Sequence, residues 1–243
     1  MTTWAVLLLM SGCQKAGPAV APAAANSDEA RPPQATTTPA YTLGEDASPM
    51  LLDPDLATET APPSYDVRLT TSQGDVVVHV ERSWAPHAAD RFYNLVQAGF
   101  YDQAAFFRTI HGFVAQFGIS AFPQVSKKWR DASIPDDTVL LSNTRGRLTM
   151  AMRGTPNSRT TQLFINLTDN TSLDRMGFAP FAEVTEGMEV IDTLHETGEG
   201  RPRGPGPSQG DLYKHGNTLI DRAFPDTDRV LEAVVLQAPA DEP

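Results

Sequence analysis

Residues 106–118 have the sequence FFRTIHGFVAQFG, and this stretch decides how the rest of the chain is interpreted. Side chains alternate along a β-strand, so Phe106, Arg108 and Ile110 are expected on one face. A charged guanidinium among aromatic side chains is costly to bury unless it has a partner or a task. For an isolated strand, the simpler interpretation is an arginine on the solvent side of the sheet. The stretch by itself leaves both interpretations open.

Short strand candidates on both sides of this stretch indicate a mainly β fold. Residues 65–70 and 75–80 alternate and are joined by a Ser-Gln-Gly turn, which is typical of a β-hairpin. A helix is expected from Pro86 until Gly99, and a second short helix at 188–194. The further candidate strands are residues 106–110, 114–117, 148–152, 162–167, 180–184 and 230–236. Eight short strands with long irregular connections predict a closed antiparallel barrel capped by two helices.

The composition excludes several classes of function. The 243 residues include 19 Lys+Arg and 30 Asp+Glu, and the resulting net charge of -11 argues against non-specific binding to nucleic acid. A single cysteine excludes an internal disulfide framework and a thiolate metal cage. The five histidines are scattered and show none of the spacings of metal-binding motifs. We therefore expect neither a metal ion nor a cofactor.

Three segments together resemble the cyclophilins, a family of peptidyl-prolyl cis-trans isomerases. Residues 106–118 are similar to the family signature F-H-R-x-I-x-G-F-x-x-Q-G-G. The second segment is LTMAMRG at 148–154 with SRTTQLFI at 158–165, and the third runs from LD at 173–174 to FAPFAEVTEGM at 178–188. They occur in the family's order, and the resemblance extends from about residue 64 to residue 236. It implies an eight-stranded barrel with two capping helices and isomerase activity without a covalent intermediate.

The resemblance also assigns roles to individual residues. Arg108 corresponds to the catalytic arginine, and Gln116 to a glutamine that hydrogen-bonds the substrate backbone. The other expected substrate-binding residues form the proline pocket, the backbone rail beside the peptide and a second polar contact: Phe113, Val114, Ala151, Met152, Gln162, Phe164, Leu173 and Phe178. The match at Phe178 is approximate, because its loop is one residue longer than usual. Met152 replaces an asparagine, and Ser172 stands where many cyclophilins have a tryptophan.

The N-terminal part of the chain has a different character. Residues 4–10 form a short apolar run, and the following Ser11-Gly12-Cys13 resembles the lipobox of bacterial lipoproteins. We therefore interpret residues 1–13 as a signal peptide with Cys13 as the lipidated mature N-terminus; the alternative is a chance apolar N-terminus on a cytosolic protein. Residues 14–63 are rich in Ala, Pro, Ser and Thr and are expected to be a disordered linker. Residues 64–243 would then form the isomerase domain.

These features predict a lipid-anchored monomer in the periplasm or cell envelope that isomerises Xaa-Pro bonds in exported polypeptides. Two alternatives remain open, because the replacements at Met152 and Ser172 affect the binding region. The chain could be a non-catalytic peptide-binding or chaperone module, or a structural envelope lipoprotein, on the same barrel. The Gly/Pro-rich residues 198–210 are interpreted as a flexible surface insertion, with a rim loop of the site as the functional alternative.

Overall fold

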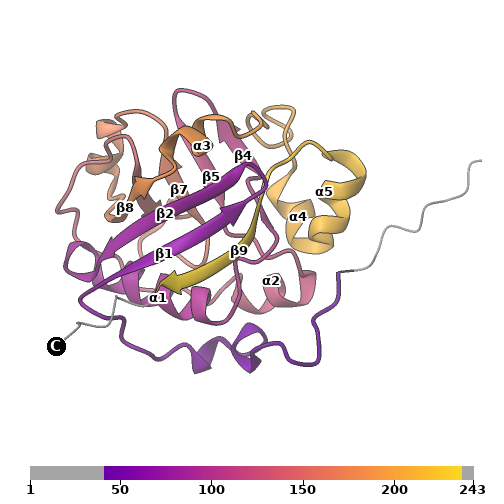
Figure 1. The fold of residues 1–243 in the computed structure, drawn as a ribbon, viewed down its shortest axis with the longest axis horizontal. Helices are drawn as coiled ribbons and strands as arrows, with labels where there is room; N and C mark the ends of the chain where they lie inside the picture. The colour runs from indigo at the N-terminus through magenta and orange to yellow at the C-terminus, as the bar shows by residue number, and fades with distance from the viewer. Residues whose placement is uncertain (1–40, 237–243) are drawn as a thin grey trace, which may run out of the picture. The chain divides into compact units, whose positions relative to one another are not determined.

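The computed structural model describes residues 41–236. Their strands form one curled antiparallel sheet in the order β3-β9-β1-β2-β8-β6-β7-β5-β4 (Figure 1). The strands are β1 (Ser64–Thr71), β2 (Gly74–Glu81), β3 (Ala104–Ala105), β4 (Arg108–Ile110), β5 (Val114–Phe117), β6 (Arg147–Met150), β7 (Leu163–Asn166), β8 (Pro180–Glu186) and β9 (Arg229–Leu236). The mainly β fold expected from the sequence is confirmed.

The closed eight-stranded barrel is not confirmed, because the nine strands within residues 41–236 form an open half-barrel. Of the expected strand at 106–110, only Arg108–Ile110 is a strand, β4, and the two-residue β3 precedes it. β3 and β4 are the two edges of the sheet, and no ladder joins them within residues 41–236. Between them the chain crosses from β9 to β5, and the Phe106 N–H donates to the Asp228 carbonyl at 2.9 Å. Phe106 packs against Phe117 inside the sheet, whereas Phe107 belongs to a separate cluster. Phe106 therefore does not share a face with Arg108, contrary to the simple alternation.

In the described part of the chain, five α-helices accompany the sheet, rather than the two expected. α1 (Pro86–Gln97) and α3 (Met188–Asp192) correspond to the two that the sequence predicted. The other three are α2 (Pro123–Trp129), α4 (Gln209–His215) and α5 (Asn217–Ala223), each of seven residues. Two turns are too few for a clear helical period, and helices of this length depend on tertiary packing for stability.

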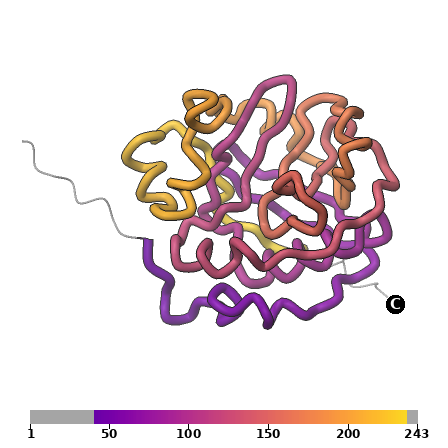
Figure 2. The backbone as a smooth tube through the Cα atoms, turned by 180° about the vertical axis from the view of Figure 1, so that it is seen from behind, coloured from indigo at the N-terminus to yellow at the C-terminus, as the bar shows by residue number. Residues whose placement is uncertain are grey.

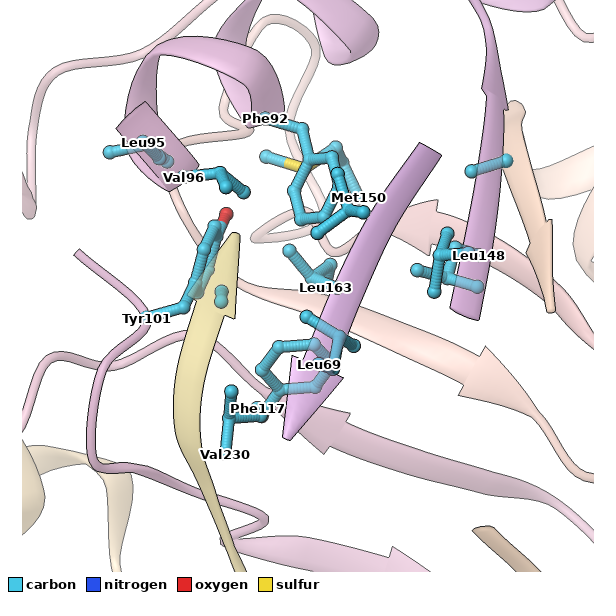
Figure 3. Packing of buried hydrophobic residues seen from close by; sticks show 14 of the residues in the cluster. Leu69, Phe92, Leu95, Val96, Tyr101, Phe117, Leu148, Met150, Leu163 and Val230 are labelled. Carbon is cyan, nitrogen blue, oxygen red and sulfur yellow. The ribbon is translucent and has the colours of Figure 1, made fainter. Parts of the chain in front are cut away.

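The core lies between α1 and the concave face of the sheet. α1 contributes Phe92, Leu95 and Val96 to the buried cluster that also holds Leu69, Leu148 and Leu163 of the strands (Figure 3). The Phe92 and Phe181 rings lie 5.3 Å apart between their centroids. This apolar interior makes the sheet a rigid frame, and the strands that carry the signature residues are part of it.

Residues 41–63 differ from the disordered linker expected there. They form the short 3-10 helices η1 (Pro49–Leu51) and η2 (Pro54–Leu56) and pass along α1 and α2, as the indigo segment of Figure 1 shows. Leu51 is buried, and its carbonyl accepts a 3.1 Å hydrogen bond from Trp129 Nε1. Asn94 bonds both the N–H and the carbonyl of Glu59. The folded unit therefore includes these residues, because specific polar contacts and apolar side chains such as Leu51 and Ala61 attach them to the core.

The proposed signal segment 1–13 with Cys13, and linker residues 14–40, lie outside the described residues. Within residues 41–236, no helix combines the length and the apolar character that crossing a bilayer would require.

Candidate active site

The signature residues lie side by side because β4, β5 and β7 are neighbours in the sheet. Arg108 is the ladder partner of Gln116, and Gln116 is the partner of Phe164. Directly opposed residues on neighbouring strands present their side chains on the same face. Val114 is two residues from Gln116 on β5 and therefore shares this face. Strand pairing thus assembles four expected site residues into one continuous surface.

An apolar cluster forms one half of this surface. Val114, Phe164 and Leu173 are buried together, and Phe113, Ala151 and Phe178 pack against them. The Phe164 and Phe178 rings meet edge to face with centroids 5.7 Å apart. Leu173 comes from the short helix η4 (Thr171–Met176), and Phe178 follows it. These side chains line a cavity of about 670 Å³, to which Met152 also contributes.

A polar network centred on Asp174 holds η4 in place. Asp174 Oδ1 accepts hydrogen bonds from the Asn143 N–H and Asn143 Nδ2, both at 2.8 Å, and Oδ2 accepts one from Ser142 Oγ at 2.5 Å. Asn143 Nδ2 also donates to the Phe178 carbonyl at 2.8 Å. Burial alone would raise the pKa of Asp174, but these hydrogen bonds hold it below its usual range. The carboxylate therefore links the segment carrying Leu173 and Phe178 to the sheet.

Acid is expected to loosen this side of the cavity. Because the pKa of Asp174 is lowered in the folded state, its stabilising effect is complete above the unfolded-state value of about 3.9 and is lost as pH falls through the folded-state value. Asp174→Asn should therefore lose less unfolding free energy than the parent protein between pH 6 and pH 3 in urea titrations. Asp46→Asn, at an exposed position, is the control and should keep the parent's pH dependence. Equal losses for parent and Asp174→Asn would contradict this account.

The polar half of the surface is a row of hydrogen-bonded side chains. Arg108 Nη1 donates to Gln116 Oε1 at 3.3 Å, and Gln116 Nε2 donates to Gln162 Oε1 at 2.8 Å. The Arg108 guanidinium carbon lies 5.3 Å from the centroid of the Phe113 ring. The Arg108 side chain is 18% exposed and lines the cavity. Its charge therefore borders the apolar cluster and does not point into bulk solvent.

Residues 198–210 form another wall of the same cavity. The Gly198 N–H donates to the Thr109 carbonyl at 2.9 Å, which attaches this segment to β4. Its orange-to-yellow trace lies beside the magenta β4–β5 hairpin in Figure 2. Glu199 forms an ion pair with Arg108 and lines the cavity, as do Arg201 and Arg203. The segment is therefore a rim loop in position, whereas a role of this loop in admitting clients stays a prediction.

The glycines in this segment explain its compact shape. A Cβ on Gly204 would lie 2.4 Å from the Glu199 carbonyl oxygen, and one on Gly206 would lie 2.9 Å from the Thr197 carbonyl oxygen. The Gly206 N–H donates to the Glu199 carbonyl at 2.9 Å. The glycines thus allow backbone to pack directly on backbone, which a flexible insertion would not require.

Sequence reasoning did not identify Glu199 as a site residue. The Arg108 guanidinium, with added positive charge from Arg203, holds the pKa of the Glu199 carboxyl below its usual range, although burial acts in the opposite direction. Glu199 and Arg108 are 91 positions apart, so no local pattern links them. An acidic residue within a dense Gly/Pro segment is the one sequence feature that could have drawn attention to it.

The structure brings most expected site residues to one cavity. All of them line it except Gln162, which contacts the row through Gln116, and Cys13, which lies outside the described residues. The Ala151 N–H donates to the Gln162 carbonyl at 2.8 Å, so the chain after β6 runs along the cavity edge.

Comparisons with known proteins agree with this geometry. The family model described as "Cyclophilin type peptidyl-prolyl cis-trans isomerase/CLD" matches residues 66–209. Peptidyl-prolyl cis-trans isomerase B of Escherichia coli is 36% identical over 143 residues, covering 56% of this chain and 87% of that protein. The cyp18 isomerase of Streptomyces antibioticus is 34% identical over 146 residues, covering 57% of this chain and 87% of that protein.

Solved structures show the same fold. A Cryptosporidium parvum cyclophilin-type isomerase superposes with a TM-score of 0.55 at 24% identity, covering 72% of this chain and 99% of that one. Cyclophilin AquaCyp293 of Hirschia baltica gives a TM-score of 0.55 at 17% identity, covering 80% and 82%. With the matched sequence segments and the assembled cavity, these findings show that the chain belongs to the cyclophilin-type peptidyl-prolyl cis-trans isomerases.

Proposed function

We propose that this isomerase accelerates rotation about Xaa-Pro bonds of polypeptides by stabilising the twisted imide with Arg108. The observation that carries the proposal is the position of the guanidinium on the wall of an apolar cavity, beside Phe113. A proline ring is apolar and would occupy the cluster formed by Phe113, Val114, Phe164 and Leu173. The adjoining imide bond would then lie next to the charge.

The chemistry requires only a positioned donor. Delocalisation of the nitrogen lone pair makes rotation slow, with a barrier of about 18–20 kcal/mol. At the transition state this delocalisation is lost and electron density returns to the prolyl nitrogen. A donor aimed at that nitrogen stabilises the transition state more than either ground state. A hydrogen bond to a charged group contributes about 1.5–3 kcal/mol, which corresponds to roughly 10- to 150-fold in rate.

The rest of the acceleration would come from holding the peptide. The apolar cluster restrains the ring, while Gln116 and the chain at Ala151 and Met152 lie where the flanking peptide backbone would pass. Fixing both sides of the bond reduces the motion needed to reach the twisted geometry. No nucleophile and no proton transfer enter this mechanism.

Exchange spectroscopy by NMR on a short Xaa-Pro peptide tests the proposal. Catalytic amounts of the chain should increase the cis-trans exchange rate, and the peptide should broaden the resonances of cavity residues. Binding without faster exchange would favour the non-catalytic peptide-binding module instead. Absence of both would reject the proposed function.

The proposed site of action is the periplasm or cell envelope, on exported clients. Its support is the lipobox-like Ser11-Gly12-Cys13, and mass spectrometry of the mature N-terminus distinguishes an acylated Cys13 from an unmodified start.

A further inference from the structure

We propose that Glu199 is a positioning residue of the isomerase reaction: its carboxylate holds the Arg108 guanidinium in the orientation in which its remaining donors face the cavity. This inference rests on the proposed function of Arg108. It adds a residue outside the three segments that resemble the family, and it gives residues 198–210 a role.

The hydrogen bonds of Arg108 divide its donors into two groups. A guanidinium has five N–H donors in a rigid plane. Arg108 Nε donates to Glu199 Oε2 at 3.0 Å, and Nη2 donates to Glu199 Oε1. Nη1 donates to Gln116 Oε1 at 3.3 Å. Three donors are therefore used within the protein, and two are left for a bound peptide.

The bidentate contact fixes the orientation of the guanidinium plane as well as its distance from the Glu199 carboxylate. Two parallel N–H···O bonds between an arginine and a carboxylate define the orientation of the guanidinium. With Gln116 on Nη1, the group is held at both of its sides. The Phe113 ring, 5.3 Å from the guanidinium carbon, limits the remaining movement.

Glu199 can act as an anchor because its own backbone is fixed. Gly198, the preceding residue, donates its N–H to the Thr109 carbonyl at 2.9 Å, and the Thr109 N–H donates to Thr197 Oγ1 at 2.8 Å. Thr109 is the chain neighbour of Arg108. The Glu199 carbonyl accepts a 2.9 Å hydrogen bond from the Gly206 N–H, and this bond closes residues 199–206 into a compact loop. The carboxylate therefore starts from a backbone position tied to β4.

The other end of the polar row is held by the same part of the chain. Gln162 Nε2 donates to Gln209 Oε1 at 3.1 Å and to the Tyr213 hydroxyl at 3.0 Å, and both partners are on α4. The row Glu199–Arg108–Gln116–Gln162–α4 thus begins and ends in residues 199–213. This arrangement orients the side chains of two strands from outside the sheet.

Positioning matters because an unrestrained arginine has several rotatable bonds. Ordering such a side chain during the reaction costs rotamer entropy that a prearranged group has already lost. A donor that is already aimed at the reacting bond also needs no reorganisation at the transition state. Loss of the anchor should therefore reduce catalysis mainly through kcat.

Glu199→Ala is expected to lower kcat about tenfold, with KM changed less than twofold. Glu199→Gln keeps one acceptor for Arg108 and should give an intermediate rate. The matched control is Glu189→Ala, which removes the same charge at an exposed position on α3 and should leave the rate unchanged. The parent protein is assayed beside all three with an uncharged Xaa-Pro peptide by NMR exchange.

The pH profile separates positioning from a structural effect. The pKa of Glu199 is lowered in the folded state, so the contact is complete above the ordinary carboxyl value of about 4.3 and is lost as pH falls through the folded-state value. The parent rate should decline more steeply over that range than the rate of Glu199→Ala, which keeps only the acid dependence expected from Asp174. In nitrogen-15 spectra, the Arg108 Nε–H resonance of the parent should be protected from exchange, and Glu199→Ala should lose this protection.

An unchanged or increased rate for Glu199→Ala would overturn the inference, because the carboxylate would then be neutral or would block the arginine. That result, with an active parent, leaves the proposed function intact. An inactive parent protein would instead reject the proposed function itself, so the two failures are distinguishable.

Discussion

Replacing Arg108 by alanine should lower kcat/KM for a Xaa-Pro peptide at least tenfold while the protein remains folded. The substitution removes the donor proposed to stabilise the twisted imide, a contribution of about 1.5–3 kcal/mol. It leaves Glu199 without its partner, but the Glu199 side chain is 42% exposed and water can solvate it. The fold should therefore survive, because the core beneath α1 does not include Arg108.

Two further variants make this result specific. Arg108→Lys keeps the charge but lacks the planar fork, so it should recover only part of the lost rate. Arg222→Ala removes an exposed arginine on α5 and should behave like the parent protein. The measurement is NMR exchange, with circular dichroism to confirm folding. Parent-like turnover by a folded Arg108→Ala protein would reject Arg108 as the catalytic group.

Gly118→Ala is expected to destabilise the fold strongly. Gly118 has φ +99°, and a Cβ there would lie 2.5 Å from the Thr161 carbonyl oxygen and 2.8 Å from Gln162 Cα. Both are backbone atoms, so neither can move aside without shifting the strand. Unfavourable backbone geometry and overpacking together should cost about 2–5 kcal/mol. Urea denaturation at neutral pH measures this loss.

The close approach at Gly118 also serves the site. It brings the ends of β5 and of the 161–162 segment together, and the 2.8 Å hydrogen bond between Gln116 and Gln162 lies next to it. A Gly118→Ala protein that still folds should therefore bind peptide more weakly than the parent.

A matched control for Gly118 lies in the β4–β5 turn. Gly112 also has a positive φ, +76°, but a Cβ there would have no atom within 4 Å. Gly112→Ala should therefore lower the free energy of unfolding by only about 1–2 kcal/mol, which is the effect of the unfavourable backbone conformation alone. Equal losses for the two alanine variants would show that the contact with Thr161 is not the cause.

The strand positions could largely be predicted from the sequence because they depend on local periodicity, and the site residues on them because their segments match the family. Alternation identified the strands that became β1 and β2, and the family segments located Arg108, Gln116 and Phe164 on what became β4, β5 and β7. Only a few strand pairings are then possible, since strands that follow one another in the chain tend to pair in an antiparallel sheet.

Alternation failed where the chain leaves one strand for another. Phe106 and Arg108 have the spacing of one face, but the crossing between β3 and β4 directs Phe106 into the core. Residues 41–63 were missed for a related reason. Their composition is that of a linker, and only contacts such as the one between Leu51 and Trp129 order them.

Short-range patterns and matching segments are enough to predict the family, the mainly β fold and the arginine beside an apolar pocket. The ion pair between Arg108 and Glu199, 91 positions away, depends instead on how the chain folds in three dimensions. The partner of a charged group is set by which backbone segments meet in space. Here the contact between Arg108 and Glu199 depends on Gly204 and Gly206, which allow their own backbone to approach that of residues 197–199 closely. These residues lie outside the three segments that resemble the family.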